Sequence, residues 1–185
     1  MTFLAIAWLP IVVSAVLVFV VSAIANMALP HHRKEWASAP DQAALQAALK
    51  DATAGRYVFP DPGDPAQRGT PEFQARWAAG PSGFLTVMPR GPMSMGRNLG
   101  LTFLLELVIS FFAAYVLWRA FGAVGPGYHA VFRMTFTLGL MAYALAPGFD
   151  TIWFGKTWRA WANTAIDGVL FALVMAGTFG WLWPR

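Results

Sequence analysis

Four long runs of apolar residues, separated by more polar stretches, set the pattern of this chain. They cover about residues 3–29, 99–121, 128–146 and 162–183. Crossing the roughly 30 Å hydrocarbon core of a bilayer takes about 20 helical residues, and each run reaches or closely approaches that length. The pattern therefore predicts an all-α integral membrane protein with four transmembrane helices in a single membrane domain.

The first run shares one feature with a secretory signal peptide, because Ala23 and Ala25 form an A-x-A pattern within "SAIAN". Signal peptides carry basic residues before an apolar core of roughly 7 to 15 residues. No basic residue precedes this run, and its apolar stretch is longer than such a core. We therefore expect it to be a retained transmembrane helix.

A loop of about 70 residues, 30–98, separates the first two runs and is expected to form a partly structured surface subdomain. "SAPDQAALQAALKDATAG" predicts a helix capped by Ser38. "TPEFQARWAAG" predicts a second helix with Thr70 as its cap, Pro71 in its first turn and Gly80 after its end. "RYVFP" and "GFLTVMP" predict possible short strands. The apolar faces of these elements favour the membrane surface.

The composition agrees with a membrane protein and excludes several classes of function. The chain is 57% hydrophobic and only 12% charged, whereas soluble domains average about 25% charged residues. Its net charge of +4 comes from scattered basic residues, so no nucleic-acid partner is expected. The absence of cysteine excludes disulfides and thiolate sites. No nucleophile elbow, zinc-protease or nucleotide-binding motif is present, so we expect neither an enzyme nor a cofactor.

The basic residues near the helix ends predict an orientation. Four spans place both termini on one side and the long loop on the other. The loop side carries six basic residues near the helix ends and the terminal side carries three: Arg33, Lys34, Arg90, Arg97, Lys156 and Arg159 against Arg119, Arg133 and Arg185. Because basic residues favour the cytoplasmic side, the loop is expected in the cytoplasm and the termini outside.

Two acidic residues interrupt the apolar runs, Glu106 in the second and Asp167 in the fourth. Carboxylates facing lipid are costly, so both are expected to point into the bundle. Counted from the loop side at 1.5 Å per residue, they reach similar depths. We therefore predict an intramembrane polar cluster of Glu106, Asp167, Asn163, Arg97, Asp150 and Arg159. The cluster either fixes helix packing or forms part of a proton or ion pathway.

Small residues recur every four positions along the fourth run: Thr164, Gly168, Ala172, Ala176 and Gly180. Small side chains at this spacing let helix backbones approach closely in a membrane. The pattern predicts a helix-packing face, used either within one chain or between two copies.

One candidate metal site combines soft sulfur ligands with imidazoles. Met88, Met93 and Met95 lie close together before the second run, and His31 and His32 follow the first. Thioethers select Cu(I), which makes copper handling one reading of this composition. Methionines also fill apolar contacts at interfaces, and a basic segment after a span anchors to lipid headgroups, so we expect no bound metal.

Several stretches together resemble a known group of proteins: "HHRKEW", "RYVFP", "GPSGFLTVMPRGPMSMG", "IDGVLFAL" and "AGTFGWLWPR". They are similar to an uncharacterised family of small bacterial four-helix inner-membrane proteins. The resemblance covers nearly the whole chain and implies a multi-pass protein of the bacterial inner membrane. It implies no catalytic or ligand residues.

Taken together, these features predict a non-catalytic accessory, assembly or scaffold protein that acts through helix–helix contacts. Its expected partners are membrane lipids and either other membrane proteins or a second copy of itself. A small transporter using Glu106 and Asp167 is the first alternative, and a copper-handling membrane protein is the second.

Overall fold

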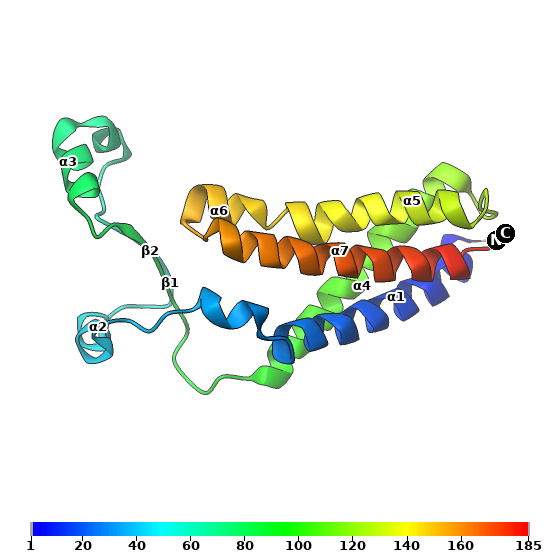
Figure 1. The fold of residues 1–185 in the computed structure, drawn as a ribbon, viewed down its shortest axis with the longest axis horizontal. Helices are drawn as coiled ribbons and strands as arrows, with labels where there is room; N and C mark the ends of the chain where they lie inside the picture. Colours follow the sequence, from blue (N-terminus) through cyan, green and yellow to red (C-terminus); the bar gives the residue numbers. More distant parts are fainter. Residues whose placement is uncertain (1, 185) are drawn as a thin grey trace.

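The computed structural model describes residues 2–184 and contains four helices that are long and apolar enough to cross a membrane (Figure 1). They are Phe3–Met27 (α1), Met95–Phe121 (α4), the continuous segment Tyr128–Phe154 and Trp158–Leu182 (α7). The four predicted runs are thus confirmed as helices of spanning length. Arg185, counted above among the basic residues of the terminal side, lies outside the described residues.

Helix α7 occupies the centre of the bundle. It packs against α1 on one side and against the Tyr128–Phe154 segment on the other, while α4 packs mainly against α1. Both ends of the described chain lie at the same end of the bundle (Figure 1). The buried apolar core is richest toward that end, where Leu117, Val131, Phe179 and Trp183 meet.

The third spanning helix is longer than predicted and changes its winding. It consists of an α-helix, Tyr128–Gly139 (α5), a π-helical segment, Leu140–Leu145 (η3), and a further α-helix, Gly148–Phe154 (α6). The sequence prediction placed its end at residue 146. Proline is tolerated at the start of a helix, where its missing N–H costs no hydrogen bond, and Pro147 directly precedes α6.

The segment 30–98 is not a loop, because regular structure runs through much of its length, including the two helices and two strands expected within it. A 3₁₀ helix, Pro30–Glu35 (η1), follows α1 directly. Residues 36–94, which we call the arm, contain Gln42–Ala48 (α2), Gly55–Phe59 (β1), Pro65–Gly69 (η2), Pro71–Ala79 (α3) and Gly83–Val87 (β2). Strands β1 and β2 pair antiparallel, with Tyr57 opposite Leu85.

The two arm helices begin at capping residues. Thr70 accepts a hydrogen bond from the backbone N–H of Phe73, and Pro71 opens α3, both as predicted. The cap of α2 is Asp41, which accepts from the N–H of Ala44, rather than Ser38. An ionised carboxylate near a helix N-terminus also interacts favourably with the helix dipole, an advantage that a serine hydroxyl lacks.

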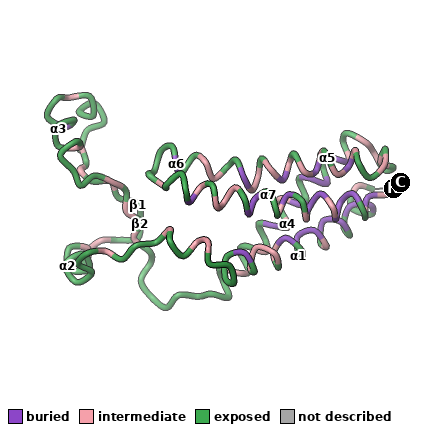
Figure 2. The backbone as a smooth tube through the Cα atoms, in the orientation of Figure 1, coloured by how far each residue is buried: buried purple, intermediate pink, exposed green. Residues whose placement is uncertain are grey.

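The arm projects from one end of the bundle and is mostly exposed, whereas buried residues follow the inner faces of the long helices (Figure 2). Aromatic contacts join the arm to α6. The ring of Phe84 lies 5.5 Å from that of Phe154, and the guanidinium carbon of Arg56 lies 4.0 Å from the Phe154 ring centre. The arm is therefore in contact with the end of the third spanning helix.

The small residues of α7 face α5 and η3 within the same chain. A Cβ built on Gly168 would lie 2.6 Å from the carbonyl carbon of Tyr143. A Cβ built on Gly139 would lie 2.8 Å from that of Ala172, and one on Gly180 would lie 2.8 Å from the ring of Tyr128. Ala172 and Ala176 are fully buried. Close backbone approach thus replaces side-chain packing along this contact.

Candidate functional site

A cluster of polar side chains joins η1 to the first half of α7. Pro30 begins η1 directly after the first spanning helix, and the turn carries His31, His32 and Glu35. On α7, Asn163 and Asp167 lie four residues apart and therefore share a face. The cluster is held by two elements that are more than 120 residues apart in the sequence.

His32 lies between two carboxylates. Its Nδ1 is 2.7 Å from Oε1 of Glu35, and its Nε2 is 2.8 Å from Oδ2 of Asp167. Ionised carboxylates only accept hydrogen bonds, so His32 donates through both ring nitrogens when both acids are charged. That form of the ring is the imidazolium cation, and its charge offsets one of the two negative charges.

His31 contacts the same aspartate and stacks on its neighbour. Its Nε2 lies 3.1 Å from each carboxylate oxygen of Asp167, and the two imidazole centres are 4.1 Å apart. The side-chain amide of Asn163 donates to the backbone oxygen of His31 at 3.1 Å and to Oε1 of Glu35 at 2.8 Å. Asn163 therefore positions the backbone of His31 and also the carboxylate of Glu35, which in turn orients the ring of His32.

The surroundings shift the pKa of two residues of η1, His32 and Glu35. Burial acts to lower the pKa of His32, but the hydrogen bonds to Asp167 and Glu35 outweigh it and raise the pKa above the usual 6.5. For Glu35, burial acts to raise the pKa, but hydrogen bonds from Asn163 and His32 outweigh it and lower the pKa below 4.5. The cluster favours the charged forms of His32 and Glu35.

Lys156 adds a positive charge at the edge of the cluster. Its Nζ donates to Oγ1 of Thr164 at 3.0 Å, and its charge contributes to lowering the pKa of Glu35. The hydroxyl of Thr164 donates in turn to the backbone oxygen of Ala160. This small residue of the α7 face therefore has a polar role as well as a packing role.

The geometry also fits a metal ion. The side-chain donor atoms of His31, His32 and Asp167 all lie within 4.8 Å of one another. Two imidazoles and a carboxylate form a common ligand set for divalent transition metals. Metal binding is therefore a chemistry that this arrangement supports.

The predicted polar cluster is only partly brought together. Asn163 and Asp167 lie in the site described above, and Glu106 lies elsewhere, hydrogen-bonded to Tyr143. Among residues 2–184, no hydrogen bond or ion pair joins Glu106 to Asp167. The grouping of these residues with Arg97, Asp150 and Arg159 was wrong. All three are exposed, because charged side chains at helix ends lower their energy by reaching water.

Glu106 is buried between α4 and η3 and accepts a hydrogen bond from the hydroxyl of Tyr143. One turn along α4, the hydroxyl of Ser110 lies 3.4 Å from that of Ser14 on α1. Both contacts join spanning helices through polar groups in the bundle interior. The carboxylate thus faces inward, as its cost in lipid requires.

We predict that the Glu106–Tyr143 pair contributes to stability mainly because each polar group gives the other a hydrogen-bond partner inside the bundle. Glu106→Leu or Tyr143→Phe alone leaves one buried or partly buried polar group without its partner, which costs about 1–3 kcal/mol of unfolding free energy. The double variant should lose less than the sum of the two. Unfolding in detergent measures this cycle, with Tyr115→Phe, an exposed tyrosine on α4, as the control. Additive losses would contradict the prediction.

The methionines and the two histidines have different surroundings. Met88, Met93 and Met95 are 72%, 85% and 56% exposed at the base of the arm. Met88 lines a shallow cavity with Lys50, Asp51 and Arg90. The histidines contact acidic side chains, and the sulfur–imidazole ligand set considered from the sequence has no support in these contacts.

The sequence did not predict two residues that hold polar groups in place, Glu35 beside His32 and Tyr143 beside Glu106. Glu35 follows His32 by three residues, the spacing at which side chains in a helical turn meet, so that signal was present. Tyr143 gave no comparable signal, because the π-helical segment changes which side chains face α4. Comparison with models of known protein families, with curated proteins and with solved structures found no match for this chain.

Proposed function

We propose that this chain is a non-catalytic accessory or assembly protein of the bacterial inner membrane that anchors its arm and presents it to a partner protein. The four-helix bundle is the anchor. The small-residue face of α7 packs against α5 and η3 of the same chain, so it is not the surface offered to a partner. The arm is the part of the chain left for recognition outside the bundle.

The observation that carries this proposal is the fixation of the arm at its root. A flexible connection between two spans would need no buried polar contacts. Here His31 and His32 both contact Asp167. The side-chain amide of Asn163 also donates to the backbone oxygen of His31 and to Glu35, so η1 is fixed to α7. Ordering this segment costs conformational entropy, which is consistent with an arm that must be held in a defined position.

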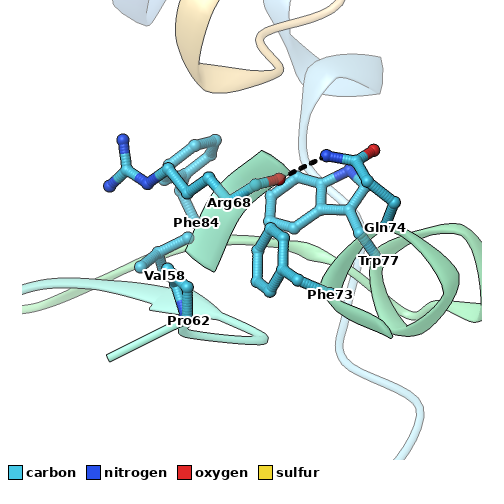
Figure 3. Close-up of a pocket in the computed structure, with 7 residues that line it drawn as sticks. All are labelled: Val58, Pro62, Arg68, Phe73, Gln74, Trp77 and Phe84. Atoms are coloured by element: carbon cyan, nitrogen blue, oxygen red, sulfur yellow. Dashed lines mark hydrogen bonds between the residues drawn. The ribbon is translucent and has the colours of Figure 1, made fainter. Parts of the chain in front are cut away.

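The surface of the arm suits a protein partner. Strands β1 and β2 form a sheet of only two strands, so each has one edge without a neighbouring strand. An extended segment can add to such an edge through main-chain hydrogen bonds. Next to the sheet lies an apolar cavity of about 320 Å³, lined by Phe73, Trp77, Phe84, Val58, Pro62, Arg68 and Gln74 (Figure 3). We call the pair of strands β1 and β2 the ribbon. We propose that a partner strand pairs with one edge of the ribbon and places a side chain in this cavity.

The positive charges support an arm in the cytoplasm and termini outside, since basic residues concentrate near the loop-side helix ends. A reporter that works only in the cytoplasm should remain inactive when fused to the C-terminus. The alternative of an ion pathway has less support, because Glu106 and Asp167 are engaged by different partners. Copper handling through the three methionines has less support because all three are exposed.

In vivo photo-crosslinking tests the proposal. A photoreactive amino acid replaces Phe59 or Phe84, both exposed on the ribbon, in the full chain in native membranes. We expect a discrete adduct with one protein, or with a second copy of this chain, from these positions. The matched control is Val124, an exposed residue between α4 and α5 at the opposite end of the bundle. Adducts equal to the control at both ribbon positions would contradict the proposal.

A further inference from the structure

We propose that His31, His32 and Asp167 bind one divalent transition-metal ion of the Zn²⁺ class at the root of the arm, with Glu35 and Asn163 as positioning residues. This inference goes beyond the proposed function and does not depend on the partner of the arm. It stands on the donor atoms, their orientation by a second layer of contacts, and their access to solvent.

The donor atoms are close to the separations that a metal ion requires. In a tetrahedral zinc site with bonds of roughly 2.0–2.1 Å, neighbouring ligand atoms lie about 3.3–3.4 Å apart. In this structure Nε2 of His31 and of His32 lie 3.1 Å and 2.8 Å from Oδ2 of Asp167. The two histidine donor atoms lie within 4.8 Å of each other, so small side-chain movements would bring all three donor atoms to coordinating separations.

A second layer of contacts orients His32 for coordination. Metal-bound histidines commonly donate their other ring N–H to a carboxylate, which fixes the ring and its tautomer. Glu35 accepts from Nδ1 of His32 at 2.7 Å, so Nε2 is the nitrogen directed at Asp167. The proton now shared between that nitrogen and Asp167 is the one that a metal ion would replace.

Asn163 supports both sides of the site from α7. Its amide donates to Glu35 and to the backbone oxygen of His31, and Asp167 follows one turn later on the same rigid helix. Helix α7 thus carries the ligand Asp167 and also Asn163, which positions His31 directly and His32 through Glu35. The three ligands are therefore preorganised relative to one another. A simple ion pair between one histidine and Asp167 would need neither the second histidine nor this support.

The ligand types indicate which ion is bound, and their exposure indicates how it enters. Imidazole nitrogens with one carboxylate oxygen suit Zn²⁺, Co²⁺ and Ni²⁺, whereas Cu(I) prefers sulfur. The side chain of His31 is 28% exposed and that of Asp167 is 8% exposed, so the ion can enter from the histidine side. Three protein ligands leave a coordination position for water, whereas closed structural zinc sites have four protein ligands.

One feature opposes cation binding, and it provides a directional test. The Nζ of Lys156 lies 3.0 Å from Oγ1 of Thr164, three residues before Asp167 on α7, so its positive charge disfavours a nearby divalent cation. Lys156→Met removes this charge without removing a proposed ligand. We expect the variant to bind Zn²⁺ more tightly than the original protein.

Zinc titration of the full-length protein in detergent tests the site. The protein is purified with a histidine-free tag, stripped with a chelator and titrated by calorimetry, with Co²⁺ absorption reporting ligand geometry. We expect one equivalent of Zn²⁺ and a tetrahedral or five-coordinate Co²⁺ spectrum. His31→Ala and His32→Ala should each weaken binding more than the roughly 10- to 100-fold loss expected for Glu35→Gln.

The matched control is His129→Ala, which removes the third histidine of the chain, an exposed residue at the start of α5. It should bind Zn²⁺ like the original protein. A thermal melt without metal shows whether each variant is folded, and Glu35→Gln, which keeps both histidines and Asp167, provides a test if a ligand variant fails to fold. Absence of stoichiometric binding, or equal affinity in the His31, His32 and His129 variants, would overturn the proposal.

Discussion

Asp167→Ala is expected to lower the unfolding free energy of the metal-free protein by about 2–4 kcal/mol, the largest loss for any single polar side chain in the bundle. The variant removes the acceptor of both histidines and leaves His32 beside Glu35 alone. The cost stays at or below that of breaking a fully buried ion pair, because His31 and His32 are 28% and 18% exposed. Chemical unfolding in detergent measures it.

Two controls separate this effect from the loss of any carboxylate. Asp150→Ala removes an exposed acid at the start of α6 and should change the unfolding free energy by less than about 1 kcal/mol. Asp167→Asn keeps the shape and one acceptor oxygen, so its loss should fall between the two alanine variants. An Asp167→Ala protein as stable as the Asp150→Ala protein would contradict the importance of the cluster.

The pH dependence of stability provides a further readout of the same contacts. The raised pKa of His32 means that its contribution is fully present below 6.5, the unfolded value, and is lost as the pH rises through the folded pKa. The lowered pKa of Glu35 means that its contribution is present above 4.5 and is lost as the pH falls through the folded pKa. Both contributions coexist between these two unfolded values. His32→Ala should remove the alkaline loss, measured with metal excluded.

Gly168→Ala is the second substitution with a large expected effect. The added methyl group would lie 2.6 Å from the carbonyl carbon and 2.7 Å from the carbonyl oxygen of Tyr143. Backbone atoms cannot rotate away as a flexible side chain would, so α7 and η3 must separate. Overpacking of this kind costs about 1–3 kcal/mol, and we expect the upper part of that range, because the contact continues along the helix at Ala172 and Gly180.

Gly177 provides a matched control on the same helix. A Cβ built there meets no atom within 4 Å, so Gly177→Ala should be neutral or slightly stabilising, since alanine favours the helix over glycine by about 1 kcal/mol. Thermal unfolding of the two variants in one detergent compares them directly. Equal midpoints would show that the close approach at Gly168 is not required for stability.

The spanning helices could be predicted from the sequence because their signal is local. Each needs only a long apolar run, and the capping pattern at Thr70 and Pro71 is equally local. The third helix continues beyond the predicted end at residue 146. Proline followed by glycine usually indicates a turn, yet here Pro147 directly precedes α6, which begins at Gly148. The π-helical winding of η3 has no sequence signature comparable to hydrophobic periodicity, so the partner of Glu106 could not be identified.

Only the α7 half of the site could be predicted from the sequence, for a different reason. Asp167 and Asn163 stood out as polar residues in an apolar helix, but His31 and His32 lie just after a span, where charged residues usually contact lipid headgroups. Pairing the two sets required knowing that α1 and α7 are neighbours and that η1 follows α1 directly. Depth was the usable signal, since His31 and Asp167 both lie on the loop side of their helices.

The central place of α7 has a consequence for biogenesis. During synthesis α1, α4 and α5 leave the ribosome before α7 does, yet α7 is the helix that packs extensively against both α1 and the Tyr128–Phe154 segment. Until α7 inserts, His31 and His32 lack Asp167, and the face of the third helix around Gly139 lacks Ala172 of α7, against which it packs. Premature termination before residue 158 should therefore yield a nascent product without a completed fold, a natural substrate for membrane quality-control proteases.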